Sequence, residues 1–481
     1  MIKKDTFTIV FKWISYNVKF QIVNNLLNIW INCHIPINCF DYKIIELKVI
    51  NLRIQIAYSQ AVPRYKFYSV MNKLQNCRNL FKQLHRNQSI WTEPKGYETG
   101  ISIFNCTARK KVPLVLRRKN VATWYACGPT VYDTAHIGHA SCYVKQDIVQ
   151  RILKDYFHIN LVTAMNVTNI DDKIIKRSAE LNEDWMQLAK RYEMEFWKDL
   201  TRLHVREPNL KCRVSDYIDQ IIQFIENLIK NQSAYVTDDG SVYFELNRYK
   251  KYGKLQNLNL EQETKHEVKR SALDFALWKA SKSSSEPSWL PSWHTQEGRP
   301  GWHIECSAMA SHLFGSEIDF HSGGLDLRFP HHENEEAQSC AHHGCEQWVN
   351  YWLHTGQLHV EGDASKMSKS LKNTISISEM LEKYSAEQFR MLCLLTNYNN
   401  QMEYGKDSMD LATSLWKKLQ MFQLESKSYV QGLKPLTNFC SESLYNEVGH
   451  TARFIDEALR DNFNTARCID HIMNLITFTN K

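Results

Sequence analysis

The stretch Trp124-Tyr-Ala-Cys-Gly-Pro-Thr-Val-Tyr-Asp-Thr-Ala-His-Ile-Gly-His-Ala140 decides how the rest of the chain is interpreted. Its apolar run stops at Gly128 and Pro129, which interrupt a strand, and apolar residues recur at helical spacing from His139 onward. The pattern predicts a strand, a tight loop and a helix. The unpaired N–H groups and the positive dipole end of such a helix favour a phosphate ligand.

Three residues of this loop are candidates for binding a nucleotide. His136 and His139 could donate hydrogen bonds to phosphate oxygens, and Gly138 lets a nucleotide approach the backbone closely. Two histidines in a four-residue pattern are also common as ordinary surface or core residues. The loop alone therefore leaves its function open.

A second polar loop, Lys366-Met-Ser-Lys-Ser370, carries two ammonium groups and two hydroxyls that could hold a polyphosphate. By itself it could equally be a solvated basic loop. The two loops in this order resemble the signature pair of class I aminoacyl-tRNA synthetases, which activate an amino acid with ATP and load it onto tRNA. The resemblance implies an α/β fold, with a Rossmann-like doubly wound parallel sheet in the catalytic domain and an α-helical anticodon-binding domain after it.

A second cluster of candidate residues suits a metal ion. His331 and Glu335 are four residues apart, which on a helix places both side chains on one face. Together with Cys127 and Cys306 they offer two sulfurs, one nitrogen and one oxygen, a set that suits Zn²⁺. No Cys-x-x-Cys pair supports a metal, so a polar helix start beside two buried cysteines is the alternative.

The surrounding segments make the resemblance more specific. Trp302-His-Ile-Glu-Cys306 and His331-His-Glu-Asn-Glu335 look like segments of cysteinyl-tRNA synthetases, in which the corresponding residues, with the Cys of the Cys-Gly-Pro-Thr loop, bind zinc. The likeness runs from about residue 113 to the C-terminus and includes Asn166-Val-Thr-Asn-Ile-Asp-Asp-Lys-Ile-Ile-Lys176, Asp274-Phe-Ala-Leu-Trp-Lys279 and Glu457-Ala-Leu-Arg-Asp-Asn-Phe-Asn464. Ser322 and Lys372 depart from it, because each stands where glycine is common.

The resemblance implies an activity and a role for each candidate residue. L-cysteine and ATP, with Mg²⁺, form cysteinyl-adenylate, and the activated carboxyl passes to tRNA(Cys). The phosphates would be stabilised by His136, Gly138, His139, Lys366 and Lys369, and the substrate cysteine would be contacted by Gly128, Thr168, Trp302 and Asp326. For Trp302 simple core filling is the alternative, and Asp326 could instead bind ribose.

One zinc ion per chain would explain selectivity between cysteine and serine, which differ only in sulfur for oxygen. Zinc binds a thiolate strongly, whereas a hydroxyl is a poorer ligand that keeps its proton. A discrimination of about ten thousandfold corresponds to roughly 5.5 kcal/mol, which a shape-based pocket could not supply. An editing domain is then not required.

Other functions stay open at this point. A ligase that joins activated cysteine to a small amine would use the same catalytic residues, and a zinc-stabilised RNA-binding paralogue would lack the activity. In the resembling family the Lys173-Ile-Ile-Lys176 segment is also connected with a pyridoxal-phosphate-dependent formation of cysteine persulfide, here a secondary activity at most, and a solvated helix face is the simpler interpretation.

The amino-acid composition indicates which class of protein this is and which cellular compartment suits it. The 481 residues are 43% hydrophobic, enough for a large core and two to four domains, and no apolar run of about 18 residues predicts a membrane span. Residues 1–92 carry a net charge of +10, so the remaining residues carry −3 and any tRNA-binding charge must be local. Thirteen cysteines without regular spacing favour a reducing compartment.

The predicted organisation has six parts. They are an N-terminal extension (1–96), the first half of the catalytic domain (97–182), an insertion (183–272), the second half with the zinc ligands (273–362), the Lys-Met-Ser-Lys-Ser loop and stem-contact region (363–407), and a truncated anticodon-binding domain (408–481). A basic amphipathic segment from Met71 predicts a transit peptide and a location in the mitochondrial matrix, with a cytoplasmic protein bearing an RNA-binding basic arm as the alternative. We expect a monomer.

Overall fold

The computed structural model describes residues 91–256, 268–283, 286–362, 374–433 and 441–480. The chain divides into two compact units, Met1–Gln88 and Ser89–Lys481, and the account below concerns the second. The predicted transit segment and the Lys-Met-Ser-Lys-Ser loop lie outside the described residues. Within those residues no helix is both long and apolar enough to cross a membrane.

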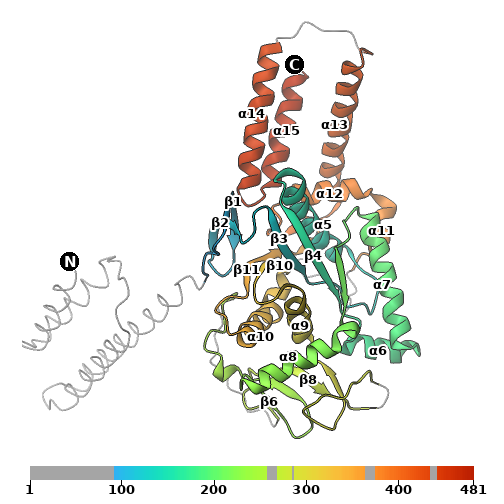
Figure 1. Cartoon of the computed structure of the whole chain (residues 1–481). Coiled ribbons are helices and arrows are strands. Elements are labelled where there is room, and N and C mark those ends of the chain that lie inside the picture. Colours follow the sequence, from blue (N-terminus) through green and yellow to red (C-terminus); the bar gives the residue numbers. More distant parts are fainter. Residues whose placement is uncertain (1–90, 257–267, 284–285, 363–373, 434–440, 481) are drawn as a thin grey trace, which may run out of the picture. The chain divides into compact units, whose positions relative to one another are not determined.

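A five-stranded parallel sheet forms the centre of the second unit (Figure 1). Its order is β11–β10–β3–β4–β5, and the strands are β3 (Val121–Ala126), β4 (Asn160–Val167), β5 (Leu210–Arg213), β10 (Ile318–Gly324) and β11 (Val349–Thr355). Trp124 of β3 lies opposite Thr163 of β4 and Phe320 of β10. The predicted doubly wound α/β fold is confirmed.

Side chains of β3 alternate between the two faces of the sheet because successive residues of a strand point in opposite directions. Trp124 and Ala126 belong to the core shared with helix α5 (Ile137–Arg151). Tyr125 and Cys127 belong to the core shared with α9 (Trp302–Phe314) and other elements of the opposite face. The strand therefore directs Cys127 away from the face that α5 covers.

The order of the strands creates a switch point between β3 and β10. After β3 the chain continues to β4, and after β10 it continues to β11, on the opposite side of the sheet. The two connections therefore run in opposite directions from the neighbouring strands β3 and β10. Ligands of doubly wound sheets bind where such connections separate, at the carboxyl ends of the strands. Cys127, the loop leading to α5 and the end of β10 all lie at this edge.

Several predicted elements appear where the sequence pattern placed them. The helix expected from His139 is α5, the apolar strand over 159–167 is β4, and the helical pattern around Trp185 is α7 (Trp185–Arg202). Strand β5, however, lies inside the range 183–272 that the sequence suggested as an insertion. Part of this range therefore completes the main sheet.

Smaller sheets and helices surround the central one. Strands β6 (Ala234–Val236), β7 (Val242–Phe244), β8 (Phe275–Ala280) and β9 (Gly298–Pro300) form an antiparallel sheet, β1 (Tyr97–Asn105) pairs with β2 (Lys110–Leu116), and β12 (Leu358–Val360) pairs with β13 (Met402–Tyr404). The other helices are α6 (Asp172–Leu181), α8 (Ile218–Lys230), α10 (Glu333–His343), α11 (Ile377–Lys383) and α12 (Ala386–Leu394).

Three C-terminal helices follow, α13 (Lys406–Val430), α14 (Ser441–Arg460) and α15 (Thr465–Thr479), which confirms the helical pattern predicted there. The turn between α14 and α15 is fixed to β1, because the Asn462 amide donates to the Ser102 carbonyl at 2.7 Å and its side chain accepts from the Phe104 amide at 2.8 Å. This turn lies in the Glu457–Asn464 segment that carried part of the family resemblance.

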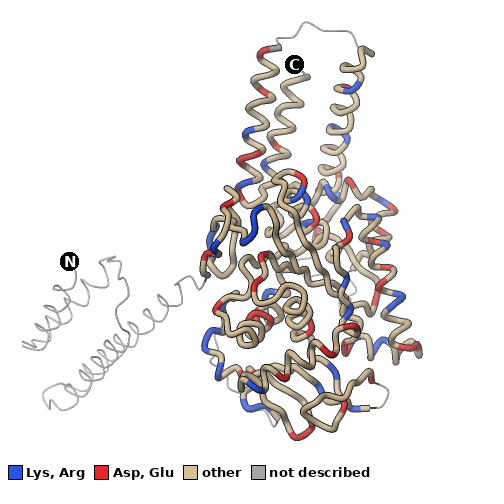
Figure 2. The backbone as a smooth tube through the Cα atoms, in the orientation of Figure 1, with Lys and Arg blue, Asp and Glu red and all other residues tan. Residues whose placement is uncertain are grey.

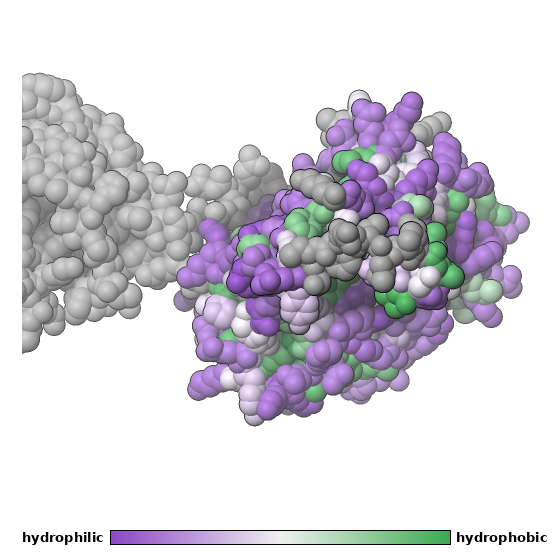
Figure 3. Space-filling view, turned by 90° about the horizontal axis from the view of Figure 1, so that it is seen from above, coloured by the Kyte–Doolittle hydropathy of each residue, from purple (hydrophilic) through white to green (hydrophobic). Residues whose placement is uncertain are grey.

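Charged residues of both signs are spread over the described elements in the view of Figure 2. Lys and Arg alternate with Asp and Glu along the elements (Figure 2), as the near-neutral charge of this part of the sequence leads one to expect. Seen from above, hydrophilic residues cover most of the visible face, and the hydrophobic ones form separate patches (Figure 3).

Candidate active site

The four predicted metal ligands converge at the carboxyl end of the sheet. Cys127 follows β3, Cys306 lies in the second turn of α9, and His331 and Glu335 lie at either side of the start of α10. Their ligand atoms all lie within 4.8 Å of one another, and all four residues are buried. Residues up to 208 positions apart in sequence thus meet in one place.

The distances between ligand atoms suit a metal ion. The two sulfurs are 3.9 Å apart, the Cys127 sulfur is 3.6 Å from Glu335 Oε1, and His331 Nε2 is 3.0 Å from the same oxygen. Tetrahedral zinc, with bonds of about 2.0–2.3 Å, separates its ligand atoms by roughly 3.3–3.8 Å. The group could therefore hold a zinc ion with small adjustments of its side chains.

The electrostatics of the cluster also suit a cation. Burial opposes ionisation of Glu335, but His321 and His331 lower the pKa of this carboxyl to about 2. Burial likewise raises the pKa of the Cys306 thiol, but the hydrogen bond with Cys127 and the charge and hydrogen bond of His331 together lower it to about 6. Burial lowers the pKa of His331, whereas Glu335 and Cys306 raise it to about 10. A divalent cation would replace the proton on His331 and neutralise the anionic groups.

Two further histidines, which the sequence did not single out, complete the surroundings of Glu335. His321 of β10 lies with its Nε2 2.9 Å from Glu335 Oε2, and His332 Nε2 is 3.3 Å from the Cys127 sulfur. With Cys127 and Glu335 they form a second group that satisfies the same metal geometry. His321 orients the carboxylate from the side opposite His331, as the outer partners of metal ligands commonly do.

Trp302 lies directly beside His331, one of the predicted metal ligands. Its ring stacks on the His331 ring at a centroid distance of 4.3 Å, and 38% of the residue is exposed. His303 Nδ1 is 2.9 Å from His331 Nδ1 on the side away from Glu335. The partial exposure of Trp302 argues against simple core filling, because a core tryptophan would be covered on both faces.

Thr168 is held in a buried hydrogen-bond chain at the end of β4. Its hydroxyl accepts from Asn166 Nδ2 at 3.1 Å and donates to Glu305 Oε2 at 3.4 Å. Burial raises the pKa of Glu305 well above the usual carboxyl range. Asn166 and Glu305 were not predicted as site residues, although both lie within the motifs that carried the resemblance.

Gly128 approaches β4 so closely that only glycine fits. Its amide donates to Asn166 Oδ1 at 2.8 Å, and an added Cβ would overlap the Asn166 carbonyl oxygen. We expect Gly128→Ala to lower the free energy of unfolding by about 2–3 kcal/mol through forced backbone shifts. Gly449→Ala is the control, because nothing lies within 4 Å of that helical position and alanine should stabilise α14 by about 0.5–1 kcal/mol. Urea denaturation measures both, and equal stability of the two variants would contradict this role of Gly128.

His136 and His139, the two histidines of the loop before α5, form the N-terminal cap of this helix. His136 Nδ1 accepts from the Gly138 amide at 3.1 Å, and His139 Nδ1 accepts from the His136 amide at 3.2 Å. The rings stack at 3.9 Å. Because both Nδ1 atoms are acceptors, each neutral ring carries its proton on Nε2, the atom that can donate to a phosphate.

The start of α5 is also joined to the chain that follows the Lys-Met-Ser-Lys-Ser loop. The Ile137 amide donates to the Ile375 carbonyl at 2.9 Å, the Ile377 amide donates to the Ala135 carbonyl at 3.3 Å, and His136 pairs with Ser376. Lys366 and Lys369 lie outside the described residues. Their loop nevertheless leads into a segment that contacts the histidine loop directly.

Asp326 lies in a short helical turn, Leu325–Leu327, at the end of β10. Burial, and to a smaller extent the charge of Asp326, raise the pKa values of Cys142 and Tyr143 in α5. Ser322, where glycine is common in the resembling family, is buried, accepts from Trp124 Nε1 at 2.8 Å and donates to Gln146 Oε1 at 2.8 Å. The departure is therefore accommodated by partners within the fold.

Two of the segments that carried the resemblance bind each other. Asp172, the first residue of α6, accepts from Lys279 Nζ at 2.7 Å and pairs with Arg299 of β9. Lys173 lies over the Tyr132 ring at 5.5 Å, and Lys176 is largely exposed and 3.9 Å from Glu180. These ion pairs join the antiparallel sheet to the segment that follows Thr168.

Comparison with known proteins agrees with this geometry. The methionyl-tRNA synthetase of Mycobacterium tuberculosis, solved in complex with methionyl-adenylate, has the same fold with a TM-score of 0.57 at 14% identity, over 75% of this chain and 82% of that one. Residues 114–414 match the family described as tRNA synthetases class I (C) catalytic domain. The sheet, its switch-point loop and this match define a class I aminoacyl-tRNA synthetase.

Relatives in two eukaryotes narrow the assignment. A Xenopus tropicalis protein described as a probable mitochondrial cysteine–tRNA ligase is 45% identical over 394 residues, which cover 81% of this chain and 68% of that protein. The cytoplasmic cysteine–tRNA ligase of Dictyostelium discoideum is 42% identical over 81% of this chain and 62% of its own length. The chain belongs to the cysteine–tRNA ligase family.

Proposed function

We propose that the chain selects L-cysteine at a zinc ion held by Cys127, Cys306, His331 and Glu335, and then joins it to tRNA(Cys). The convergence of these four buried groups is the observation that carries the proposal. A bound zinc ion supplies strong affinity for a thiolate and weak affinity for a hydroxyl. Trp302, stacked on His331, would cover the side chain of the substrate.

The remaining pocket residues would position the substrate. Thr168 and the Gly128 backbone lie at the ends of neighbouring strands, where the amino and carboxyl groups of a cysteine anchored by its sulfur would fall. Asp326 would contact the substrate or the ribose from the α5 side. Each of these groups is already oriented by a partner within the fold, so binding would need little reorganisation.

ATP would lie over the start of α5. The Nε2–H groups of His136 and His139 would donate to its phosphates, and the amide of Gly138 lies at the positive end of the helix dipole. Lys366 and Lys369 would offset the charge that develops as pyrophosphate leaves, and Mg²⁺ would accompany ATP. The contact between Ile375 and Ile137 supports this arrangement, since it anchors the second loop beside the first.

Attack by the cysteine carboxylate on the α-phosphorus would form a C–O–P linkage and release pyrophosphate. The terminal ribose hydroxyl of tRNA(Cys) would then displace AMP from the activated carboxyl. The described helices α13 to α15 would contribute to the recognition of this tRNA. The similarity to the frog protein, described as a mitochondrial form, supports a location in the mitochondrial matrix.

Charging assays test the proposal. The full chain with cysteine, ATP and Mg²⁺ should exchange labelled pyrophosphate into ATP and should load cysteine onto tRNA(Cys), and serine at equal concentration should give an exchange rate lower by about 10⁴-fold. Exchange without loading would favour a ligase that uses a small amine as acceptor. No exchange would favour a non-catalytic RNA-binding protein.

A further inference from the structure

Cys340 and Cys345 lie together at the C-terminal end of α10, outside the residues assigned to the ligase reaction. Gly344 ends the helix in the left-handed conformation, with a φ of +66°, and the amides of Gly344 and Cys345 both donate to the Cys340 carbonyl. In this type of helix end, the side chains at these two positions meet. The two thiols form no disulfide with other cysteines, and each influences the pKa of the other, as neighbouring groups do.

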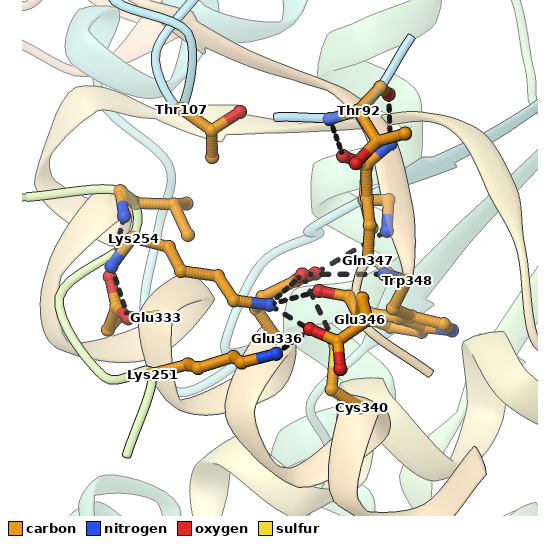
Figure 4. A network of polar contacts seen from close by, with 12 residues as sticks. Thr92, Thr107, Lys251, Lys254, Glu333, Glu336, Cys340, Glu346, Gln347 and Trp348 are labelled. Atoms are coloured by element: carbon orange, nitrogen blue, oxygen red, sulfur yellow. Dashed lines mark hydrogen bonds and ion pairs between the residues drawn. The ribbon is translucent and has the colours of Figure 1, made fainter. Parts of the chain in front are cut away.

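A buried ion pair lies against the thiol of Cys340, which is the more deeply buried of the two cysteines (Figure 4). Lys254 Nζ is 2.9 Å from Glu336 Oε1, and both side chains are only 3% exposed. The Cys340 sulfur is 3.5 Å from Lys254 Nζ and 3.3 Å from Glu336 Oε1. The Cys340 sulfur thus lies against both members of this buried ion pair.

The two thiols differ in exposure and in pKa, as the two members of a reactive cysteine pair do. Cys345 is partly exposed, and the hydrogen bond from Cys340 lowers the pKa of its thiol. Cys340 is buried, and its contact with Cys345, together with burial, raises its pKa. Susceptible thiols are those with thiolate character and access to solvent, commonly beside a second cysteine.

We propose that Cys340 and Cys345 are a modification site at which a peroxide forms a reversible disulfide. The Cys345 thiolate attacks one peroxide oxygen, the O–O bond breaks, and the departing hydroxide takes up the proton that the thiol released, so that a sulfenic acid and water result. The Cys340 thiol attacks the Cys345 sulfur, so that the S–S bond forms, the S–O bond breaks, and the departing hydroxide leaves as water with the Cys340 proton. Two thiols lose two electrons in total, and hydrogen peroxide becomes two waters.

Peptide mass spectrometry of the full chain tests this site. After brief exposure to hydrogen peroxide, the protein is denatured, alkylated with N-ethylmaleimide and digested with trypsin, which releases residues 329–366 with these two cysteines alone. We expect this peptide to carry no alkyl group and to be lighter than the unmodified peptide by two hydrogens. Treatment with a dithiol reductant before alkylation should restore both alkyl groups.

Two variants serve as controls. Cys345→Ser should leave Cys340 fully alkylated after peroxide, because the attacking thiol is gone. Cys468→Ala removes another buried cysteine, in α15, and should form the 340–345 linkage as the unaltered protein does. Two alkyl groups on the peptide after peroxide, a sulfinic acid at Cys345 beside an alkylated Cys340, or a bond from Cys340 to a different cysteine would each overturn the proposal.

Discussion

Cys306→Ser is expected to reduce zinc from about one ion per chain to near zero and to lower cysteine-dependent pyrophosphate exchange by at least about 100-fold. The estimate is a lower limit, since even the outer partners of metal ligands change affinity or activity by about 10–100-fold. Serine keeps its proton and is a poor zinc ligand, so the cluster would lose one of its two sulfurs. Elemental analysis of the purified variant measures the metal, and exchange of labelled pyrophosphate measures activation.

The matched control is Cys212→Ser in β5. Cys212 is as buried as Cys306, with 1% of each residue exposed, but it does not belong to either group of metal ligands. Its replacement should leave zinc content and exchange close to those of the unaltered chain. A Cys306→Ser protein that keeps its metal and activates cysteine normally would show that selection of the substrate rests on other groups.

The sequence predicted the helices and strands that can be identified from the pattern of apolar residues within the element itself. Helix α5 followed from the helical spacing of its apolar residues after the break at Gly128 and Pro129, and β4 followed from the largely apolar stretch 159–167. Strand β5 has only four residues, Leu210-Lys-Cys-Arg213, and its pattern has no apolar run. Its place in the sheet depends on pairing with β4, which no local pattern records.

The candidate metal site likewise depends on contacts between distant residues, which local sequence patterns cannot predict. Spacing alone indicated that His331 and Glu335 share a face, but it could not show that Cys127 and Cys306 reach them. That convergence depends on the order of strands in the sheet and on the packing of α9 and α10 against one of its faces. The role of His321 could not be predicted, because its contact with Glu335 arises only where β10 lies beneath α10.

The sequence pattern likewise did not predict that His136 and His139 cap helix α5. This capping role changes how their mutation must be interpreted. His139→Ala would remove two things, the Nδ1 acceptor that caps the His136 amide and the Nε2 donor proposed for phosphate. Loss of a cap costs about 1 kcal/mol of stability. Loss of one donor to a charge that develops in the transition state costs about 10²–10³-fold in rate.

We therefore expect His139→Ala to lower cysteine-dependent pyrophosphate exchange by about 10²–10³-fold, with zinc content unchanged because the metal ligands lie on the opposite face of the sheet. His139→Glu separates the two roles, since glutamate at the third helical position can accept the same amide but cannot donate to a phosphate. Its thermal stability should approach that of the unaltered chain while its exchange rate stays at least as low as that of His139→Ala. Recovery of exchange in His139→Glu would mean that the ring acts only as a helix cap and that the ATP phosphates are bound elsewhere.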